Sequence, residues 1–317
     1  MLINLIIMKK SIQIYILSRN RPLFLKVAID SVLNQNHSQI KFEIIVSDNS
    51  DNESICKKIE ENCIQKNVRY IRRNPPLIHI DHMNSVVSEL NSEYSVIFHD
   101  DDILDPDYIN VMSSFFNESE VVLVGCNSMN FKDNILDPKD VQDSKLRINN
   151  LSSTTKFYNE KNFLERYLPG NDGNAPFPSY MYRTKFLKQA MLKIPVTGNH
   201  ADVSILSSHL NYGTIAWLEK PLMYYRIHDS NDTVIEQITS SISLFNYMKK
   251  KGIKKNSIRL QLFKVMFMKK WLLQQGNIKS NISSRRYRVI VLFFLLKTMK
   301  LLVRISFWKL VLKRLFR

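Results

Sequence analysis

Acidic side chains gather at two places in the sequence, each directly after an apolar run. Asp48 follows the run Phe42–Ser47, and the triplet Asp100–Asp102 follows the run Tyr94–His99. Three consecutive carboxylates repel one another and cost stability unless a cation neutralises them. Mg²⁺ and Mn²⁺ take oxygen ligands and commonly join one or two carboxylates to substrate phosphates. We therefore interpret the triplet as a divalent-cation site for a diphosphate; the alternative is that one aspartate caps a following helix.

Two common phosphate-binding motifs are absent from the sequence. The chain has only seven glycines, with no GxGxxG after the first apolar run and no GxxxxGK[ST] anywhere. A dinucleotide-binding fold and a P-loop both depend on glycines that let backbone N–H groups approach the phosphates. A diphosphate bound by this chain would need a metal ion in place of that backbone cradle.

The elements that position these residues follow from the pattern of the first 126 residues. The predicted strands are Ile12–Leu17, Phe42–Ser47, Val68–Arg72, Tyr94–His99 and Val121–Cys126. Between them, helical spacing or polarity predicts Leu23–Gln35, Asp51–Lys66, His79–Leu90 and Asp107–Phe116, the first with Pro22 in its first turn. Strands alternating with helices predict an α/β fold with a mainly parallel central sheet flanked by helices. Ligands of such sheets bind beyond the carboxyl ends of the strands, where the acidic residues lie.

The second half of the chain is less regular. Residues 133–156 are polar, without clear periodicity, and are predicted to form loops. Regular structure is predicted again at Lys161–Leu168, Ser179–Arg183, Thr184–Leu192, Asp202–Asn211, Thr214–Leu218 and Leu222–Ile227. From Ser241 the pattern is helical and basic. We expect two parts, a domain of residues 1–237 and a basic amphipathic helical region of residues 238–317.

The net charge of +16 is concentrated at the C-terminus. From Ser241 to Arg317 there are 20 Lys and Arg and no acid, which leaves 25 basic and 29 acidic residues elsewhere. Such asymmetry predicts a polyanionic partner. Basic residues recur at helical spacing among apolar and aromatic ones: Lys297, Lys300, Arg304, Lys309, Lys313 and Arg317. The apolar content favours an anionic membrane surface over nucleic acid; the alternative is a helix packed on the body of the protein.

The remaining composition bears on location. No stretch reaches the roughly 20 apolar residues of a membrane span. Three cysteines form no disulfide framework, which fits a reducing compartment. The apolar start precedes Lys9 and Lys10, the reverse of a secretory signal, and Met8 is a second candidate start. We expect a cytoplasmic protein at the inner face of the cell membrane.

Six segments together carry a resemblance to a known family: Ser18–Pro22, Ile29–Gln35, Glu43–Ser50, His99–Asp102, His200–Asp202 and Tyr225–His228 followed by Asn231. They resemble the family-2 glycosyltransferases, which have the nucleotide-diphospho-sugar transferase (GT-A) fold. It covers about residues 10–235. The departures are His200, where the family commonly has Glu, and the basic tail.

The resemblance implies a role for each matching residue. Those that would bind the nucleotide-sugar are Ser18, Arg19, Asn20, Asp48, Asp100, Asp101 and His228. Ser18 and Asp48 would line the base. Asp102, with Asp101, would hold Mg²⁺ or Mn²⁺. Asp202 would be the catalytic general base, with a helix cap as the alternative, and His228 would reach the diphosphate or metal unless it is only structural.

The predicted function is that of an inverting glycosyltransferase. It would transfer a hexosyl group from a nucleotide-diphospho-sugar, with UDP as the expected nucleotide, to the hydroxyl of a glycan or lipid-linked acceptor. Lipopolysaccharide, O-antigen or capsule biosynthesis is the expected setting. The alternative is a non-catalytic membrane-surface or nucleic-acid-binding protein on a degenerate GT-A fold; a nucleic-acid partner is the less favoured of these.

Overall fold

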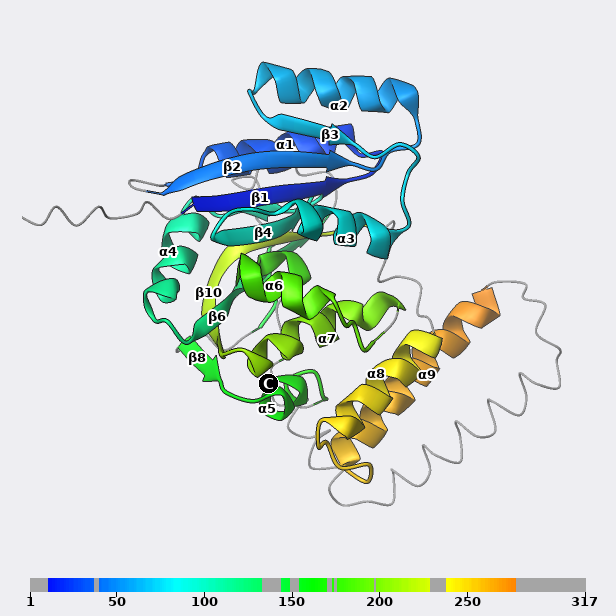
Figure 1. Cartoon of the computed structure of the whole chain (residues 1–317). Helices are drawn as coiled ribbons and strands as arrows, with labels where there is room; N and C mark the ends of the chain where they lie inside the picture. Colours follow the sequence, from blue (N-terminus) through cyan, green and yellow to red (C-terminus); the bar gives the residue numbers. More distant parts are fainter. Residues whose placement is uncertain are drawn as a thin grey trace, which may run out of the picture. The chain divides into compact units, whose positions relative to one another are not determined.

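The computed structural model contains two compact units (Figure 1). It describes residues 11–36, 40–132, 144–148, 154–169, 173, 176–196, 198–228 and 238–277. The first unit comprises Met1–Tyr158, Ala175–Leu192 and His209–His228, and the second comprises Asn159–Asn174, Lys193–Ser208 and Asp229–Arg317. The predicted boundary near residue 237, Asn231 and the tail from residue 278 lie outside the described residues, so the two-part division stays a prediction.

One mixed sheet organises the first unit. Its strands are β1 (Ser11–Ser18), β2 (Lys41–Asp48), β3 (Arg69–Arg72), β4 (Tyr94–His99), β5 (Ile103–Leu104), β6 (Val121–Lys132), β7 (Lys145–Leu146), β8 (Thr154–Phe157), β9 (Tyr180–Arg183) and β10 (Thr214–Ile227). Their order is β3-β2-β1-β4-β9-β6-β10-β5, with β7 beside β6 and β8 beside β10. The strands β3, β2, β1, β4, β6 and β10 run in one direction, and β9 runs against its neighbours β4 and β6. The predicted α/β class with a mostly parallel sheet is confirmed.

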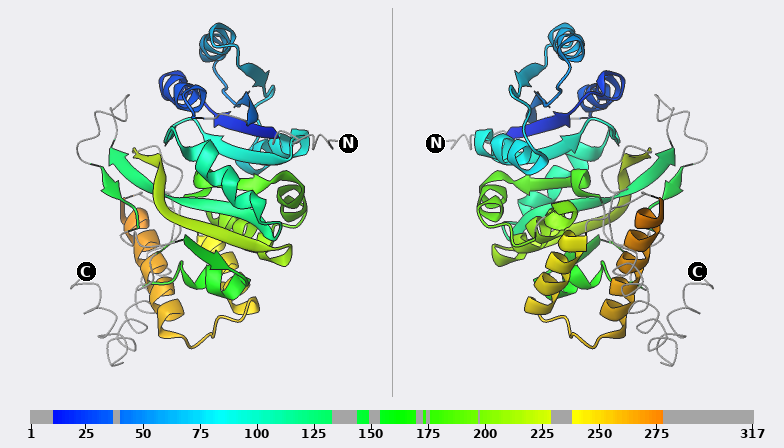
Figure 2. Two further views of the ribbon diagram at one scale, coloured as in Figure 1. Left: turned by 90° about the vertical axis from the view of Figure 1, so that its left-hand side faces the viewer. Right: turned by 90° about the vertical axis from the view of Figure 1, so that its right-hand side faces the viewer.

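Helices cover both faces of this sheet (Figure 2). They are α1 (Pro22–Leu33), α2 (Glu53–Gln65), α3 (His79–Glu89), α4 (Tyr108–Ser114) and α6 (Thr184–Met191). Ile14 and Ile16 of β1 join the core formed with α1, α2 and α4. Tyr15 points to the other face, where its hydroxyl donates to Glu89 of α3 over 3.2 Å. Side chains on both faces of β1 are therefore buried. Burial on both faces explains why the predicted strands are continuous apolar runs.

Two predictions for the second half were wrong. Residues 133–156, predicted as loops, contain β7 and the start of β8. Strands this short carry too few residues to show periodicity. The segments Thr214–Leu218 and Leu222–Ile227, predicted as separate, form the single strand β10, whose register shifts on each side of Pro221. Proline donates no ladder hydrogen bond, so it interrupts the pattern without ending the strand.

The described part of the second unit is mainly helical. Its helices are α5 (Glu160–Glu165), α7 (Ala201–Ser208), α8 (Ile238–Lys250) and α9 (Ile258–Asn277). They share an apolar core to which Leu164, Val203, Met248 and Leu260 contribute. Within the described ranges, no helix combines the length and apolar character that crossing a bilayer requires.

Candidate active site

The acidic residues meet at one end of the sheet because β2, β1 and β4 are parallel neighbours. Ser18 lies beside Asp48, and Leu17 lies beside His99. After β4 the chain turns and returns as β5 along β10. The triplet therefore occupies the turn between β4 and β5, as expected for a ligand site beyond the carboxyl ends of the strands.

The triplet is buried, and this observation helps to decide whether it is a cation site or a helix cap. The exposed fractions of Asp100, Asp101 and Asp102 are 2%, 6% and 1%. The next helix, α4, has Asp107 as its N-cap residue, so no member of the triplet caps it. Burial of three carboxylates in succession is costly unless each gains a specific partner.

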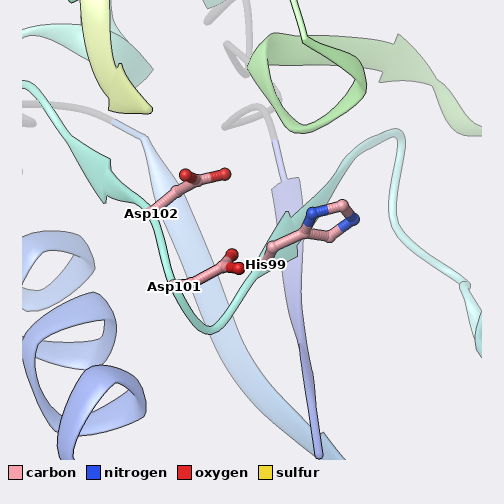
Figure 3. A group of neighbouring side chains, drawn as sticks. All are labelled: His99, Asp101 and Asp102. Carbon is pink, nitrogen blue, oxygen red and sulfur yellow. The ribbon is translucent and has the colours of Figure 1, made fainter. Parts of the chain in front are cut away.

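A group of possible metal ligands forms around the triplet. His99, Asp101 and Asp102 each offer one ligand atom, and these atoms lie within 4.8 Å of one another. Figure 3 shows the two carboxylates extending toward the side of the turn where the His99 imidazole lies. Oδ2 of Asp102 is buried and has no hydrogen-bond partner within the described part of the chain. An orphaned carboxylate oxygen beside a second carboxylate and an imidazole fits a divalent cation.

The surroundings shift the three carboxyl groups in different directions. Burial, followed by the charge of Asp101, raises the pKa of Asp100 against the opposing charge of Arg21. Burial and the same Asp101 charge hold the pKa of Asp102 well above its usual range. Burial also acts to raise the pKa of Asp101, but its hydrogen bond with His228 and nearby positive charges outweigh that effect and lower it. Burial therefore disfavours the charged forms of Asp100 and Asp102, whereas the partners of Asp101 favour its charged form.

The side chains of Arg21 and His228 contact the triplet directly. Nη1 of Arg21 donates to Oδ1 of Asp100 over 3.1 Å and to Oδ2 of Asp101 over 2.7 Å. Nε2 of His228 lies 2.9 Å from the same Asp101 oxygen. The structure thus brings His228, which follows β10, to the triplet. Its predicted contact with the diphosphate or the metal stays a prediction.

Asp48 is fully buried at the end of β2. Its Oδ1 accepts from the backbone N–H of Ser50 over 3.0 Å, and its Oδ2 accepts from the Tyr70 hydroxyl over 2.9 Å. Ser18 lies next to it on β1 and is also buried. The two residues predicted to line the base are therefore adjacent.

Arg19 and Asn20 join these two parts of the site through their backbones. The N–H of Arg19 donates to Oδ2 of Asp100 over 3.1 Å, and the N–H of Asn20 donates to the Ser50 hydroxyl over 2.8 Å. Their side chains both bind Asp51, over 3.2 and 2.9 Å. Asn20 has a φ of 58°, a left-handed conformation that Asn tolerates better than most residues.

Asp202 and His200 belong to the second unit. Oδ1 of Asp202, in the first turn of α7, accepts from the adjacent Val203 N–H over 2.8 Å. His200 packs its ring edge-on against Phe267, with centroids 5.0 Å apart, and its N–H donates to the Ser240 hydroxyl over 3.1 Å. The assignment of Asp202 as general base stays a prediction.

The sequence analysis missed three residues that contact or extend the triplet. His99 adjoins it in the chain, so that adjacency was an available signal. Arg21 lies 79 residues from Asp100, and Arg226 lies 125 residues from Asp101. Both stand in segments used for the resemblance, but nothing local in the sequence predicts their acidic partners.

Comparison with solved structures finds proteins that share the α/β fold of this chain at low sequence identity. S. aureus TarS 1-349 matches with a TM-score of 0.54 and 14% identity over 84% of this chain and 72% of that one. The same protein in complex with UDP-GlcNAc gives 0.52 and 14%, over 92% and 73%. The mannosyltransferase PcManGT from Pyrobaculum calidifontis, in complex with GDP-Man and Mn²⁺, gives 0.54 and 11%, over 97% and 87%. No curated protein matches the sequence.

The family comparison covers the acidic triplet and the residues predicted to line the nucleotide base, but not Asp202, Arg226 or His228. Residues 13–189 match the model described as Glycosyl transferase family 2. This range exceeds half of the chain and includes Ser18, Asp48 and the whole triplet. The chain therefore belongs to glycosyl transferase family 2, and it is a glycosyltransferase that transfers a sugar from a nucleotide-sugar.

Proposed function

We propose that this enzyme is an inverting, metal-dependent hexosyltransferase that uses a nucleotide-diphospho-sugar. The observation that carries the proposal is the buried Oδ2 of Asp102, which lies beside His99 and Asp101 and has no hydrogen-bond partner among the described residues. A hydrogen bond from another protein group would have satisfied that oxygen at little cost. Leaving it free is reasonable where a cation is its partner.

The cation would be held by Asp101, Asp102 and His99. When bound, it neutralises the charge that develops on the departing nucleoside diphosphate. We propose Mn²⁺ ahead of Mg²⁺, because Mg²⁺ is bound almost wholly through oxygen whereas the group includes an imidazole. The Mn²⁺ in the complex of PcManGT supports this choice.

The nucleotide would lie along the ends of β1 and β2. Ser18 and Asp48 would line the base, with Asp48 accepting from a base N–H. Arg19 and Asn20, whose backbones connect Asp100 to Ser50, would hold the segment between base and diphosphate. The two neighbours bind UDP-GlcNAc and GDP-Man, both hexosyl donors; we propose a UDP-linked donor.

Asp202 would act as the general base. A sugar hydroxyl is a weak nucleophile, and a carboxylate within hydrogen-bond reach takes its proton as it attacks. Attack from the side opposite the leaving diphosphate, in one displacement, inverts the anomeric centre. His228, already hydrogen-bonded to Asp101, would contact the diphosphate or the metal.

The acceptor would be a glycan or a lipid-linked glycan at the inner face of the cell membrane. The basic, apolar C-terminal region supports this location, because it combines attraction to anionic lipid with burial of apolar side chains. Assembly of lipopolysaccharide, O-antigen or capsule is the proposed setting.

Donor hydrolysis tests the proposal. EDTA-treated protein is supplied with a panel of UDP- and GDP-sugars, and nucleoside diphosphate release is measured with and without Mn²⁺. We expect release that requires the metal and falls at least about 100-fold in Asp102→Asn, since its orphaned oxygen becomes an amide group. Asp107→Asn, a half-exposed aspartate five residues on, should keep wild-type activity.

The outcome also decides the alternative function. Release that is unaffected by EDTA and by Asp102→Asn would reject metal-dependent transfer. A chain that binds no nucleotide-sugar, with or without metal, would instead be a non-catalytic member of the family.

A further inference from the structure

Arg226 is a fully buried arginine directly behind the triplet. Its exposed fraction is 0%, which is rare for a residue that is always charged. The guanidinium carbon lies 4.3 Å from the ring centroid of Phe24 on α1 and 4.5 Å from that of Phe131 on β6. Two aromatic faces at this distance hold the guanidinium group in one plane.

The same residue holds both aspartates of the candidate metal site. Tyr224 of β10 pairs with Ile103 of β5 in an antiparallel register, so Arg226 comes opposite the turn. Its Nε donates to the backbone carbonyl of Asp101 over 2.8 Å. Its backbone N–H donates to Oδ1 of Asp102 over 3.0 Å. One oxygen of Asp102 is thereby occupied, and Oδ2 is the oxygen left for a ligand.

We propose that Arg226 is a positioning residue that presets Asp101 and Asp102 for the divalent cation. This inference rests on the proposed metal site. The main-chain bond holds Asp102 Oδ1, and the guanidinium bond fixes the peptide that carries Asp101. A planar guanidinium between two rings can aim its Nε–H at a carbonyl, whereas a lysine ammonium on a flexible stem cannot keep that direction.

A second arginine provides a matched control. Arg183 lies over the rings of Tyr94 and Phe116 at 5.5 and 5.2 Å. It also donates to backbone carbonyls, through Nε to Val121 and through Nη2 to Phe116, each over 2.8 Å. Its chemistry matches that of Arg226, but its partners lie at the opposite end of β4, where Tyr94 begins the strand and the triplet follows its end.

The test measures binding of Mn²⁺ alone by the loss of the free-ion EPR signal. The full chain is compared with Arg226→Lys and Arg183→Lys, and each variant's melting temperature is recorded. We expect the dissociation constant for Mn²⁺ to rise at least tenfold in Arg226→Lys and to stay within twofold of wild type in Arg183→Lys. Loss of buried hydrogen bonds should lower the melting temperature of both variants, so stability alone would not produce the difference.

A milder variant covers the case in which Arg226→Lys does not fold. Phe131→Leu removes one of the two rings that contact the guanidinium and leaves every polar donor, and we expect a rise of about threefold in the dissociation constant. Mn²⁺ affinity unchanged in the folded variants, or weakened equally in Arg183→Lys, would overturn the positioning role. A wild-type chain that binds no Mn²⁺ would instead count against the proposed metal site itself.

Discussion

The three aspartates of the triplet have the same chemistry but different partners. Asp100 accepts from the Arg19 backbone and from Arg21, and Asp101 contacts Arg21 and His228. Asp102 accepts one backbone hydrogen bond and keeps its second oxygen free of protein partners in the described chain. Neighbouring residues thus have different roles. Asp100 links the segment after β1 to the turn between β4 and β5, and Asp102 is the strongest candidate ligand for the metal ion.

At the same scale, Asp202→Asn tests the proposed general base. The amide keeps the size of the side chain but cannot take a proton, so we expect kcat for sugar transfer to fall on the order of 10²- to 10⁴-fold. The dissociation constant of the nucleotide-sugar should stay within twofold, measured by calorimetry. Ser204→Ala, in the same turn of α7, is the control. Wild-type turnover in Asp202→Asn would show that another group takes the proton.

A hydrogen-bond network joins helix α3 to strand β2, next to the residue Asp48 that is predicted to line the nucleotide base. His82 is 6% exposed, and its Nε2 lies 2.8 Å from the hydroxyl of Ser47. That hydroxyl accepts from Nε of Arg73, whose guanidinium also binds Glu89 at the end of α3. With its oxygen taken by Arg73, the serine donates to a neutral imidazole. Burial first, and then the Arg73 charge, lower the pKa of His82 to about 4.

This network makes stability depend on pH. The unfolded chain binds a proton at His82 near pH 6.5, whereas the folded chain does not until about pH 4. The stabilisation is therefore present above about pH 6.5 and is lost as pH falls toward 4. We expect His82 to account for a loss of about 2 kcal/mol in unfolding free energy between pH 7.5 and pH 5.

Urea denaturation at both pH values measures that loss. His82→Gln should flatten the pH dependence by about 2 kcal/mol, because the glutamine side chain takes up no proton in this range. Equal slopes for wild type and His82→Gln would show that His82 is not the group responsible.

At the scale of the whole molecule, the residues proposed for catalysis and the residues proposed for membrane binding lie in different parts of the chain. The triplet and the residues predicted to line the nucleotide base lie in the first unit. The predicted general base, Asp202, lies on α7 of the second unit. All of the excess positive charge lies beyond residue 240. We propose that the C-terminal region brings the enzyme to the surface that carries its acceptor.

Vesicle binding tests this role of the C-terminal region. The full chain should sediment with vesicles that contain anionic phosphatidylglycerol and stay in solution with neutral ones. Raising the salt concentration should release it, because each basic residue contributes about 1 kcal/mol near an anionic surface. A variant with Lys309, Lys313 and Arg317 changed to Glu should bind at least tenfold more weakly yet release nucleoside diphosphate at the wild-type rate. Equal binding to neutral vesicles would reject the electrostatic part of the proposal.

The order of strands and helices up to residue 126 could be predicted because each element carries its own signal. Continuous apolar runs such as Tyr94–His99 give buried strands, and Pro22 gives the first turn of α1. The predicted helix Asp51–Lys66 was too long by a few residues because Asn52, not Asp51, is its N-cap. The placement of Asp48 and the triplet past strand ends followed from the same signals, as did their meeting at one edge of a parallel sheet.

The sequence by itself therefore determined the fold class, the order of its first elements and the location of the acidic site, because all three depend on local periodicity. Only the tertiary structure decided which side chains contact the triplet. Arg21 lies at the N-cap of α1, Arg226 lies in β10, and His228 directly follows that strand. They meet the triplet through long-range contacts, and a strand order such as β10 beside β5 cannot be predicted from neighbouring residues. The oxygen of Asp102 left for a cation is a property of that assembly, not of the sequence motif.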